Sequence, residues 1–278
     1  MQKFTVNKKV KLSEFLIDKY QGSLSYGKFC KLLKNKDIKV NGKRTSKDCL
    51  LEVDDLIECY FDGEKQPITV VYKDDRVLVC NKPQGITSED FYARVAQEYK
   101  TAVFTHRLDR NTSGVMIFAL DEVSYKELYN GFKERTFKKF YHCLVNGAFD
   151  LKNATLKDYL VKDEEKGEVK IYNKEVPFSK PVITAYEEVK RGEYSSVLKV
   201  ELITGRTHQI RAHLAYYGHF IIGDGKYGAE RVNKLFKVSK QLLIASSLTL
   251  KFNSESELYY LNDRTFSVDF SKIFEYLR

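Results

Sequence analysis

The chain has 278 residues, of which 43% are hydrophobic and 31% are charged, so it can bury the core of one substantial domain and a smaller one. Charged residues interrupt the first twenty positions, and no later stretch holds eighteen consecutive apolar residues. These patterns exclude a signal peptide and a transmembrane helix, and they predict a folded cytoplasmic protein.

The cysteines and histidines do not have the spacing of a disulfide framework or a zinc site. The five cysteines are scattered without a C-x-x-C pair, and their number is odd. His208 and His213 are five positions apart, which misses the spacing of H-E-x-x-H. A phosphate-binding glycine loop is missing as well. We therefore expect neither a metal nor another cofactor.

The net charge of +9 comes entirely from the first fifty residues. They contain thirteen Lys or Arg and four Asp or Glu, whereas the remainder contains thirty-four of each kind. A basic block is typical of a protein that binds a polyanion, because Lys and Arg contacts to phosphates supply affinity that does not depend on sequence. A solvated surface that favours solubility is an equally good interpretation of the charge alone.

In chain order, two short helices come first, followed by strands. Apolar residues at helical spacing predict one helix around Leu12–Tyr20 and a second around Tyr26–Leu33. The strand 38–40 runs into Asn41-Gly42, a dipeptide typical of a two-residue hairpin, and 56–61 alternates as a strand does. Residues 11–61 resemble a small RNA-binding module first described in a ribosomal protein of the small subunit.

The polar segment 62–67 contains Gly and Pro, so we place a domain boundary there. The sequence thus predicts a small basic RNA-binding module at 1–62 and a larger domain at 63–278. In the larger domain we expect strands and helices without regular βαβ alternation, which indicates an α+β fold with a largely antiparallel sheet and flanking helices. The predicted strands are 68–72, 77–80, 115–120, 137–145, 182–188, 195–202 and 242–252, and the predicted helices are 91–99, 124–134 and 209–217. The charged stretch 162–170 is predicted to be a surface hairpin or loop.

The stretch 106–114, H-R-L-D-R-N-T-S-G, lies immediately before a predicted strand. A single Asp in such a loop is usually a turn or capping residue, so Asp109 alone would not indicate catalysis. The whole nonapeptide, however, resembles the H-R-L-D-x-x-T-S-G signature of the RNA pseudouridine synthases that act on ribosomal and transfer RNA. That resemblance implies that Asp109 is the catalytic residue and that Arg107 stabilises the opened RNA.

A second segment, 204–214, resembles the T-G-R-x-H-Q-I-R-x-H-L segment of the same family. The resemblance assigns to Arg211 an ion pair with Asp109, and a fixed guanidinium stabilises the ionised form of a carboxylate in a cleft that excludes water. We expect Arg206 to contact a backbone phosphate, because its planar fork matches phosphate oxygens, and His208 to contact RNA. The alternative is an ordinary helix with a basic face.

A third segment, 138–145, resembles the family's K-x-Y-x-A-L-V strand, in which the tyrosine stacks on the target base. Tyr141 takes that position here, although a tyrosine on a strand is more often a core residue, and Cys143 replaces the usual alanine. Leu243 is expected to line the pocket, but the segment 242–245 departs from the family pattern, since Ile244 stands where histidine is common. Weaker matches occur at 81–85, 218–219 and 223–228.

The resemblance implies an isomerisation in which the uracil–ribose C–N bond is cut and the base is rejoined through its carbon five. The target uridine must leave its stack to reach the pocket. The expected partner is structured RNA, preferably large-subunit ribosomal RNA and alternatively transfer RNA, bound by a monomer. Three rival hypotheses are a non-catalytic RNA-binding protein, a base-releasing glycosidase, which would need two carboxylates, and a Ser-His-Asp hydrolase, which would need a G-x-S-x-G elbow.

Overall fold

A computed structural model describes residues 2–20, 23–61, 67–149, 152–165 and 167–278. The contacts divide the chain into two compact units, Met1–Pro67 and Ile68–Arg278. The predicted linker at 62–67 lies outside the described residues except for Pro67. No helix of the described part is long and apolar enough to cross a membrane.

The first unit packs two helices against a small antiparallel sheet in the order β1-β6-β3-β4. Both predicted helices are confirmed, and so is the hairpin, where Val40 pairs with Lys43 and Asn41 and Gly42 have φ of 50° and 77°. The three strands β1, β2 and β5 were not predicted. The elements are β1 (Gln2–Thr5), β2 (Val10–Lys11), α1 (Leu12–Lys19), α2 (Tyr26–Lys34), β3 (Ile38–Val40), β4 (Lys43–Arg44), β5 (Leu50–Leu51) and β6 (Leu56–Cys59).

The second unit is built on an eleven-stranded sheet whose main path runs β13-β12-β14-β15-β11-β16-β10-β8-β7, with β9 paired to β10 and β17 to β16. Among the described strands the pairs are antiparallel except β10 with β16, which confirms the predicted α+β class. Its strands are β7 (Thr69–Lys73), β8 (Val77–Lys82), β9 (Val103–Phe104), β10 (Ser113–Ala119), β11 (Lys138–Asn146), β12 (Asn153–Asp163), β13 (Glu168–Tyr172), β14 (Lys180–Arg191), β15 (Ser195–Leu202), β16 (Leu243–Thr249) and β17 (Thr265–Ser267).

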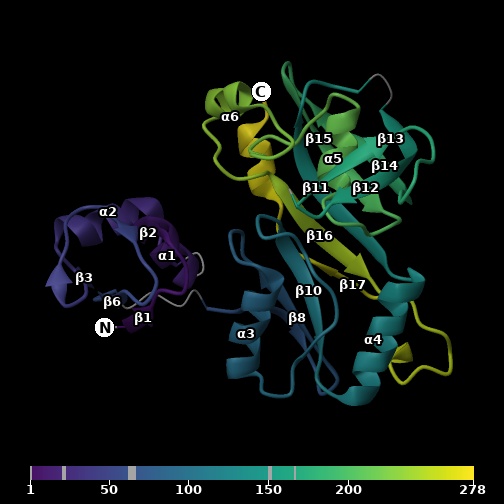
Figure 1. The fold of residues 1–278 in the computed structure, drawn as a ribbon. Helices are drawn as coiled ribbons and strands as arrows, with labels where there is room; N and C mark the ends of the chain where they lie inside the picture. The colour runs from purple at the N-terminus through teal and green to yellow at the C-terminus, as the bar shows by residue number, and fades with distance from the viewer. Residues whose placement is uncertain (1, 21–22, 62–66, 150–151, 166) are drawn as a thin grey trace. The chain divides into compact units, whose positions relative to one another are not determined.

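The helices of this unit cover both faces of the sheet. They are α3 (Ser88–Glu98), α4 (Glu122–Glu134), α5 (Gln209–Tyr216) and α6 (Glu230–Phe236), with 3-10 turns at Tyr259–Leu261 and Ser271–Tyr276. The even-numbered residues of β8 and β10 pack in the core that α3 joins, and the odd-numbered ones pack in the core that α4 joins. Figure 1 shows α3 and α4 on opposite sides of these strands. Burial on both faces explains why these strands are continuously apolar.

The predicted elements of the larger domain are all present, with ends shifted by a few residues. The charged stretch 162–170 belongs to a hairpin, as one of the two predictions for it stated, because the end of β12 pairs antiparallel with the start of β13. The strands β9, β12, β13 and β17 and the helix α6 were not predicted as separate elements. In β12 the buried residues Leu156, Asp158 and Leu160 alternate with exposed or half-buried ones, and the buried Asp158 hid the apolar pattern.

Candidate active site

The H-R-L-D-R-N-T-S-G stretch forms the loop between β9 and β10. The Asp109 carbonyl accepts a hydrogen bond from Thr112 N–H at 3.0 Å, which closes a turn. Leu108 anchors the loop in the core, where its N–H donates to the Ser88 hydroxyl and its carbonyl accepts from it. Gly114 is required at the end, since a Cβ there would lie 2.2 Å from the Ala245 carbonyl oxygen of β16. The loop therefore holds Asp109 in one place at the sheet.

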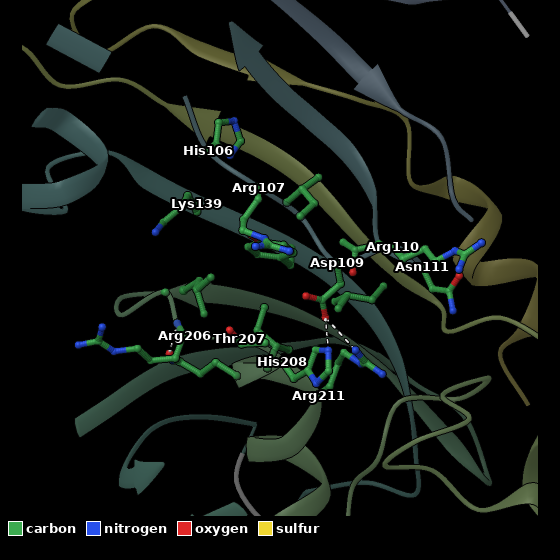
Figure 2. A pocket seen from close by; sticks show the side chains of 18 of the residues that line it. His106, Arg107, Asp109, Arg110, Asn111, Lys139, Arg206, Thr207, His208 and Arg211 are labelled. Atoms are coloured by element: carbon green, nitrogen blue, oxygen red, sulfur yellow. Dashed lines mark hydrogen bonds and ion pairs between the residues drawn. The ribbon is translucent and has the colours of Figure 1, made fainter. Parts of the chain in front are cut away.

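Asp109 is paired with Arg211, which lies 102 positions away on α5 (Figure 2). Arg211 Nη1 donates to Asp109 Oδ2 at 2.8 Å. Its Nε and Nη2 donate to the two oxygens of Asp224 at 2.7 and 3.1 Å. One guanidinium thus bridges two carboxylates and is fixed in its plane by the bidentate contact to Asp224.

The surroundings keep Arg211 and Asp224 charged. Burial opposes the charge of Arg211, but the hydrogen bonds and charges of Asp224 and Asp109 outweigh it and raise the pKa of Arg211. Burial also acts to raise the pKa of Asp224, yet Arg211 and the backbone N–H groups of Lys226 and Tyr227 lower it overall. The pair that faces Asp109 is therefore a preformed ionic support.

His208 directly precedes α5 and lies beside Arg211, facing the same oxygen of Asp109 (Figure 2). Its Nε2 is 3.9 Å from Asp109 Oδ2, and its Nδ1 is 2.9 Å from the Tyr227 hydroxyl. That hydroxyl accepts the N–H of Val169, so its own proton is free for Nδ1, and we assign the His208 proton to Nε2 on this network. Burial lowers the pKa of His208 although Asp109 opposes the effect. A neutral imidazole therefore directs an N–H toward the carboxylate side.

Apolar side chains form the floor of the pocket around Asp109. Tyr141 on β11 and Leu243 on β16 are both buried, and both line it together with Leu108 and Ile210. Burial, with a smaller effect of Asp109, raises the pKa of Tyr141, so its phenol stays protonated. The pocket has a volume of about 650 Å³, which is within the range of small-molecule sites. A single flat base can be buried there against an aromatic ring.

The rim of the pocket is basic. Arg107 is largely exposed and forms an ion pair with Glu89 at 3.3 Å. Arg206 lies in the loop between β15 and α5, and Figure 2 shows it on the side of the pocket away from Arg211. The structure therefore brings all seven predicted site residues to one pocket: Asp109, Arg211, Tyr141, Arg107, Arg206, His208 and Leu243.

Comparison with known proteins decides the family. The profile described as RNA pseudouridylate synthase matches residues 76–216, which is half of the chain and includes Asp109, Tyr141 and Arg211. This chain belongs to the RNA pseudouridylate synthase family. The reaction class predicted from the sequence, an RNA-modifying isomerase, is thereby confirmed.

Several relatives of this pseudouridine synthase match most of its length. An uncharacterised RNA pseudouridine synthase of Mycoplasma genitalium is 30% identical over 76% of this chain and 76% of its own. Ribosomal large subunit pseudouridine synthase C of Vibrio cholerae is 28% identical over 72% of this chain and 71% of its own. A dual-specificity RNA pseudouridine synthase of Pasteurella multocida is 34% identical over 60% of this chain and 80% of its own.

The fold of the synthase also occurs among solved structures. The human protein named RNA pseudouridylate synthase domain containing 1 has a TM-score of 0.63 and 23% identity, covering 77% of this chain and 96% of that chain. At this level of identity the likeness concerns the fold alone. It agrees with the α+β architecture described above.

Two further side chains of the synthase support the residues that line the pocket. No role was predicted for either of them from the sequence. Lys82 is fully buried, and its ammonium donates to the carbonyls of Pro83, Ile86 and Arg110 at 3.0, 2.8 and 3.3 Å. Burial lowers the pKa of Lys82 to about 7, against the opposing charges of Asp109 and Glu89. Lys82 thus ties the loop that carries Asp109 to the end of β8.

Asp224 is the second such group, and Tyr227 accompanies it. Both belong to the stretch 223–228, which the sequence analysis noted only as a weak match. An aspartate between two glycines indicates a turn as readily as a site, so its partner Arg211 could be found only from the fold. A buried polar network also anchors α5: His213 contacts Asp158 at 2.9 Å and Thr184 at 2.9 Å. His208 and His213 thus serve separate sites, as their spacing indicated.

Proposed function

We propose that this protein converts specific uridines of large-subunit ribosomal RNA to pseudouridine, with Asp109 as the catalytic residue. The observation that supports this most directly is the Asp109–Arg211 ion pair at 2.8 Å in a pocket of nucleotide size. The reaction needs a carboxylate beside the ribose of a base that has left its stack. Asp109 acts either as a nucleophile at the sugar or as a base that removes a sugar proton, and both roles require the ionised form.

The remaining site residues receive roles that follow from their places. Arg211 orients Asp109 through their ion pair, and Tyr141 stacks on the uracil above the apolar floor that Leu243 completes. Arg107 is exposed at the rim and stabilises the opened RNA after it leaves Glu89. His208 contacts the RNA beside Asp109 through Nε2, and Arg206 contacts a backbone phosphate.

The test of this function is release of tritium from RNA labelled at carbon five of uridine, because that hydrogen is lost when the base is rejoined there. Purified protein is expected to release tritium, and Asp109→Asn is expected to abolish release while RNA binding stays within about twofold. Asp263→Asn is the matched control, since Asp263 is exposed and pairs with Lys251 at 2.9 Å. Undiminished release by Asp109→Asn would disprove the role of Asp109.

The choice of ribosomal RNA rests on the names of relatives. Two of the matched proteins are named for the large ribosomal subunit, and the relative named dual-specificity makes transfer RNA the alternative target. Mapping pseudouridines in RNA from cells that lack this protein distinguishes them. A missing modification in transfer RNA alone would overturn the preference for ribosomal RNA. We further propose that the enzyme acts as a monomer in the cytoplasm.

We propose the first unit as an accessory RNA-binding module. It contains the entire excess of basic charge and has its own core, to which Phe15, Phe29 and Ile57 belong. Deleting residues 1–62 is expected to weaken RNA binding about tenfold at 0.15 M salt and to flatten its salt dependence, while activity on a short RNA persists. The measurement is a filter-binding titration at several salt concentrations. Loss of all activity on the short RNA would contradict this division of roles.

A further inference from the structure

One end of the pocket carries several cations, and of these only Arg206 has a role in the function proposed above. Lys139 on β11, Arg206 before α5 and Arg135 after α4 all line it, with Lys133 beside them. Figure 2 shows Lys139 and Arg206 together on one side of the pocket and Asp109 with Arg211 on the other. These cations come from three separate elements, so their convergence is a property of the fold.

Lys139 is a half-buried lysine without an anionic partner. Its ammonium lies near Gly205, where a Cβ would be 3.3 Å from Nζ. Within the described part of the chain, Lys139 has neither a hydrogen bond nor an ion pair. Burial lowers the pKa of Lys139, and the charge of Arg135 adds to this effect. A cation in this position is unfavourable until an anion joins it.

The side chain of Arg206 also lacks part of its hydrogen bonding within the described residues. Its Nε is withdrawn from solvent and has no hydrogen-bond partner among the described residues. The backbone of Arg206 is nevertheless fixed, since its N–H donates to Gln209 Oε1 at 3.1 Å and its carbonyl accepts from Gln209 N–H at 3.1 Å. Gln209 is itself buried and bonded to Ile183 and Thr184. The backbone of Arg206 is therefore held in place at the edge of the pocket that its side chain lines.

The pocket has no carboxylate to spare for these cations. Among its described lining residues the acidic side chains are Glu89 and Asp109. Glu89 is paired with Arg107, and Asp109 with Arg211. The missing anion must therefore come from outside the chain, and it must accept hydrogen bonds from an ammonium and a guanidinium together. A phosphodiester has the charge and the oxygens to do so.

We infer that Lys139 and Arg206 form a phosphate subsite that binds the backbone phosphate next to the target uridine. This inference rests on the proposed function, because the phosphate belongs to the same RNA whose uridine reaches Asp109. Holding that phosphate fixes the distance between the backbone and the carboxylate, so the subsite sets how far the flipped nucleotide enters.

The chain offers a matched control one position away. Lys138 is exposed, and it points to the opposite face of β11 because successive side chains of a strand alternate. Neither Lys138 nor Phe140 lines the pocket, whereas Lys139 and Tyr141 do. Lys138→Met and Lys139→Met remove the same charge from the same strand, so general electrostatics would affect both equally.

The experiment measures tritium release and RNA binding with the full-length protein. Lys139→Met and Arg206→Gln are each expected to raise KM about tenfold and to change kcat less than threefold. Each should lower the slope of log binding constant against log salt by about 0.7 to 0.9, the contribution of one phosphate. The double variant should add little to either single one, because both side chains contact the same group. Lys138→Met should match the wild type.

A second arm identifies the source of the phosphate. A short RNA that contains a mapped target uridine is made with a neutral methylphosphonate at each flanking linkage in turn. One of these RNAs should abolish the difference in KM between the wild type and Lys139→Met. If free phosphate were the ligand, the difference would persist with every neutral linkage, which would overturn the inference.

The outcomes separate this inference from the proposed function. If the wild type releases no tritium, the proposed function fails, and the subsite is still judged by the salt slopes of binding. If the wild type is active while Lys139→Met keeps its KM and slope, the subsite fails alone. An equal effect of Lys138→Met also overturns it. Thermal melting checks each variant, and Lys139→Gln replaces Lys139→Met if the latter does not fold.

Discussion

The two ends of the pocket differ in how their charges are compensated. At the Asp109 end, one guanidinium joins two carboxylates through three hydrogen bonds of 2.7 to 3.1 Å. At the Lys139 end, an ammonium and an orphan Nε of Arg206 have no partner within the described residues. Under the proposed function, the Asp109 end has its ionic contacts in place before RNA binds, whereas the Lys139 end receives its anion from the RNA backbone.

This contrast suggests a separate role for each end of the pocket under the proposed function. A catalytic carboxylate benefits from a fixed environment, because support that is already in place needs no reorganisation during the reaction. A binding site for phosphate benefits from unsatisfied donors, because the ligand then supplies hydrogen bonds that the free protein lacks.

Arg211→Lys should have the largest effect. Lysine offers a point charge in place of the fork, so it cannot serve Asp109 and both oxygens of Asp224 together. We expect the single-turnover rate of pseudouridine formation to fall on the order of 100-fold, which corresponds to about 3 kcal/mol. Rapid-quench tritium release with enzyme in excess measures this rate. A decrease of less than threefold would mean that the bridge between the two carboxylates is dispensable.

Asp224→Asn should have a smaller effect, because Asp109 keeps its own contact to Arg211. The amide NH₂ of the new side chain meets an Arg211 N–H, so the bidentate contact is broken and the guanidinium is free to rotate. The expected loss in the same rate is on the order of 30-fold, with KM nearly unchanged. Asp263→Asn at the exposed surface again serves as the control. An increase in KM without a loss of rate would place Asp224 in binding instead.

The smallest expected effect is on stability, through the titration of a histidine at each end of the pocket. His106 lies at the Lys139 end, stacks on Phe132 and accepts the N–H of Ile117 at 3.1 Å. Burial, together with the charge of Lys139, lowers the pKa of His106 from 6.5 to about 3. Between these values the unfolded chain binds a proton that the folded chain does not, so stability falls as the pH falls below 6.5.

From well above pH 6.5 down to pH 5.5, His106 should therefore account for a loss of about 1.4 kcal/mol in the free energy of unfolding. Urea titrations of the wild type and of His106→Gln at neutral pH and at pH 5.5 measure this difference, since glutamine can still accept the Ile117 N–H without titrating. His208→Gln should change the pH dependence of the free energy of unfolding less than His106→Gln does, because Asp109 opposes the decrease in the pKa of His208. Equal pH dependence in wild type and His106→Gln would refute the assignment.

The sequence by itself determined the family, the fold class and the identity of the candidate residues. The segments 106–114 and 204–214 are long enough to be specific, and local periodicity revealed most helices and strands of the larger domain. Asp109, Arg211 and Tyr141 could be named because each lies inside such a segment. Motifs and periodicity describe short stretches of sequence. They therefore determined individual residues and elements, but not the contacts between distant segments.

Only the tertiary structure decided how the charges are compensated. Asp224 acquires its role from a guanidinium on α5, and Lys82 acquires its role from three carbonyls of folded loops. Lys138 and Lys139 are neighbours in the sequence, yet Lys139 lines the pocket without a partner among the described residues, whereas Lys138 is exposed. The physical reason is that an electrostatic environment depends on burial and on distances between distant segments, such as the 102 positions between Asp109 and Arg211.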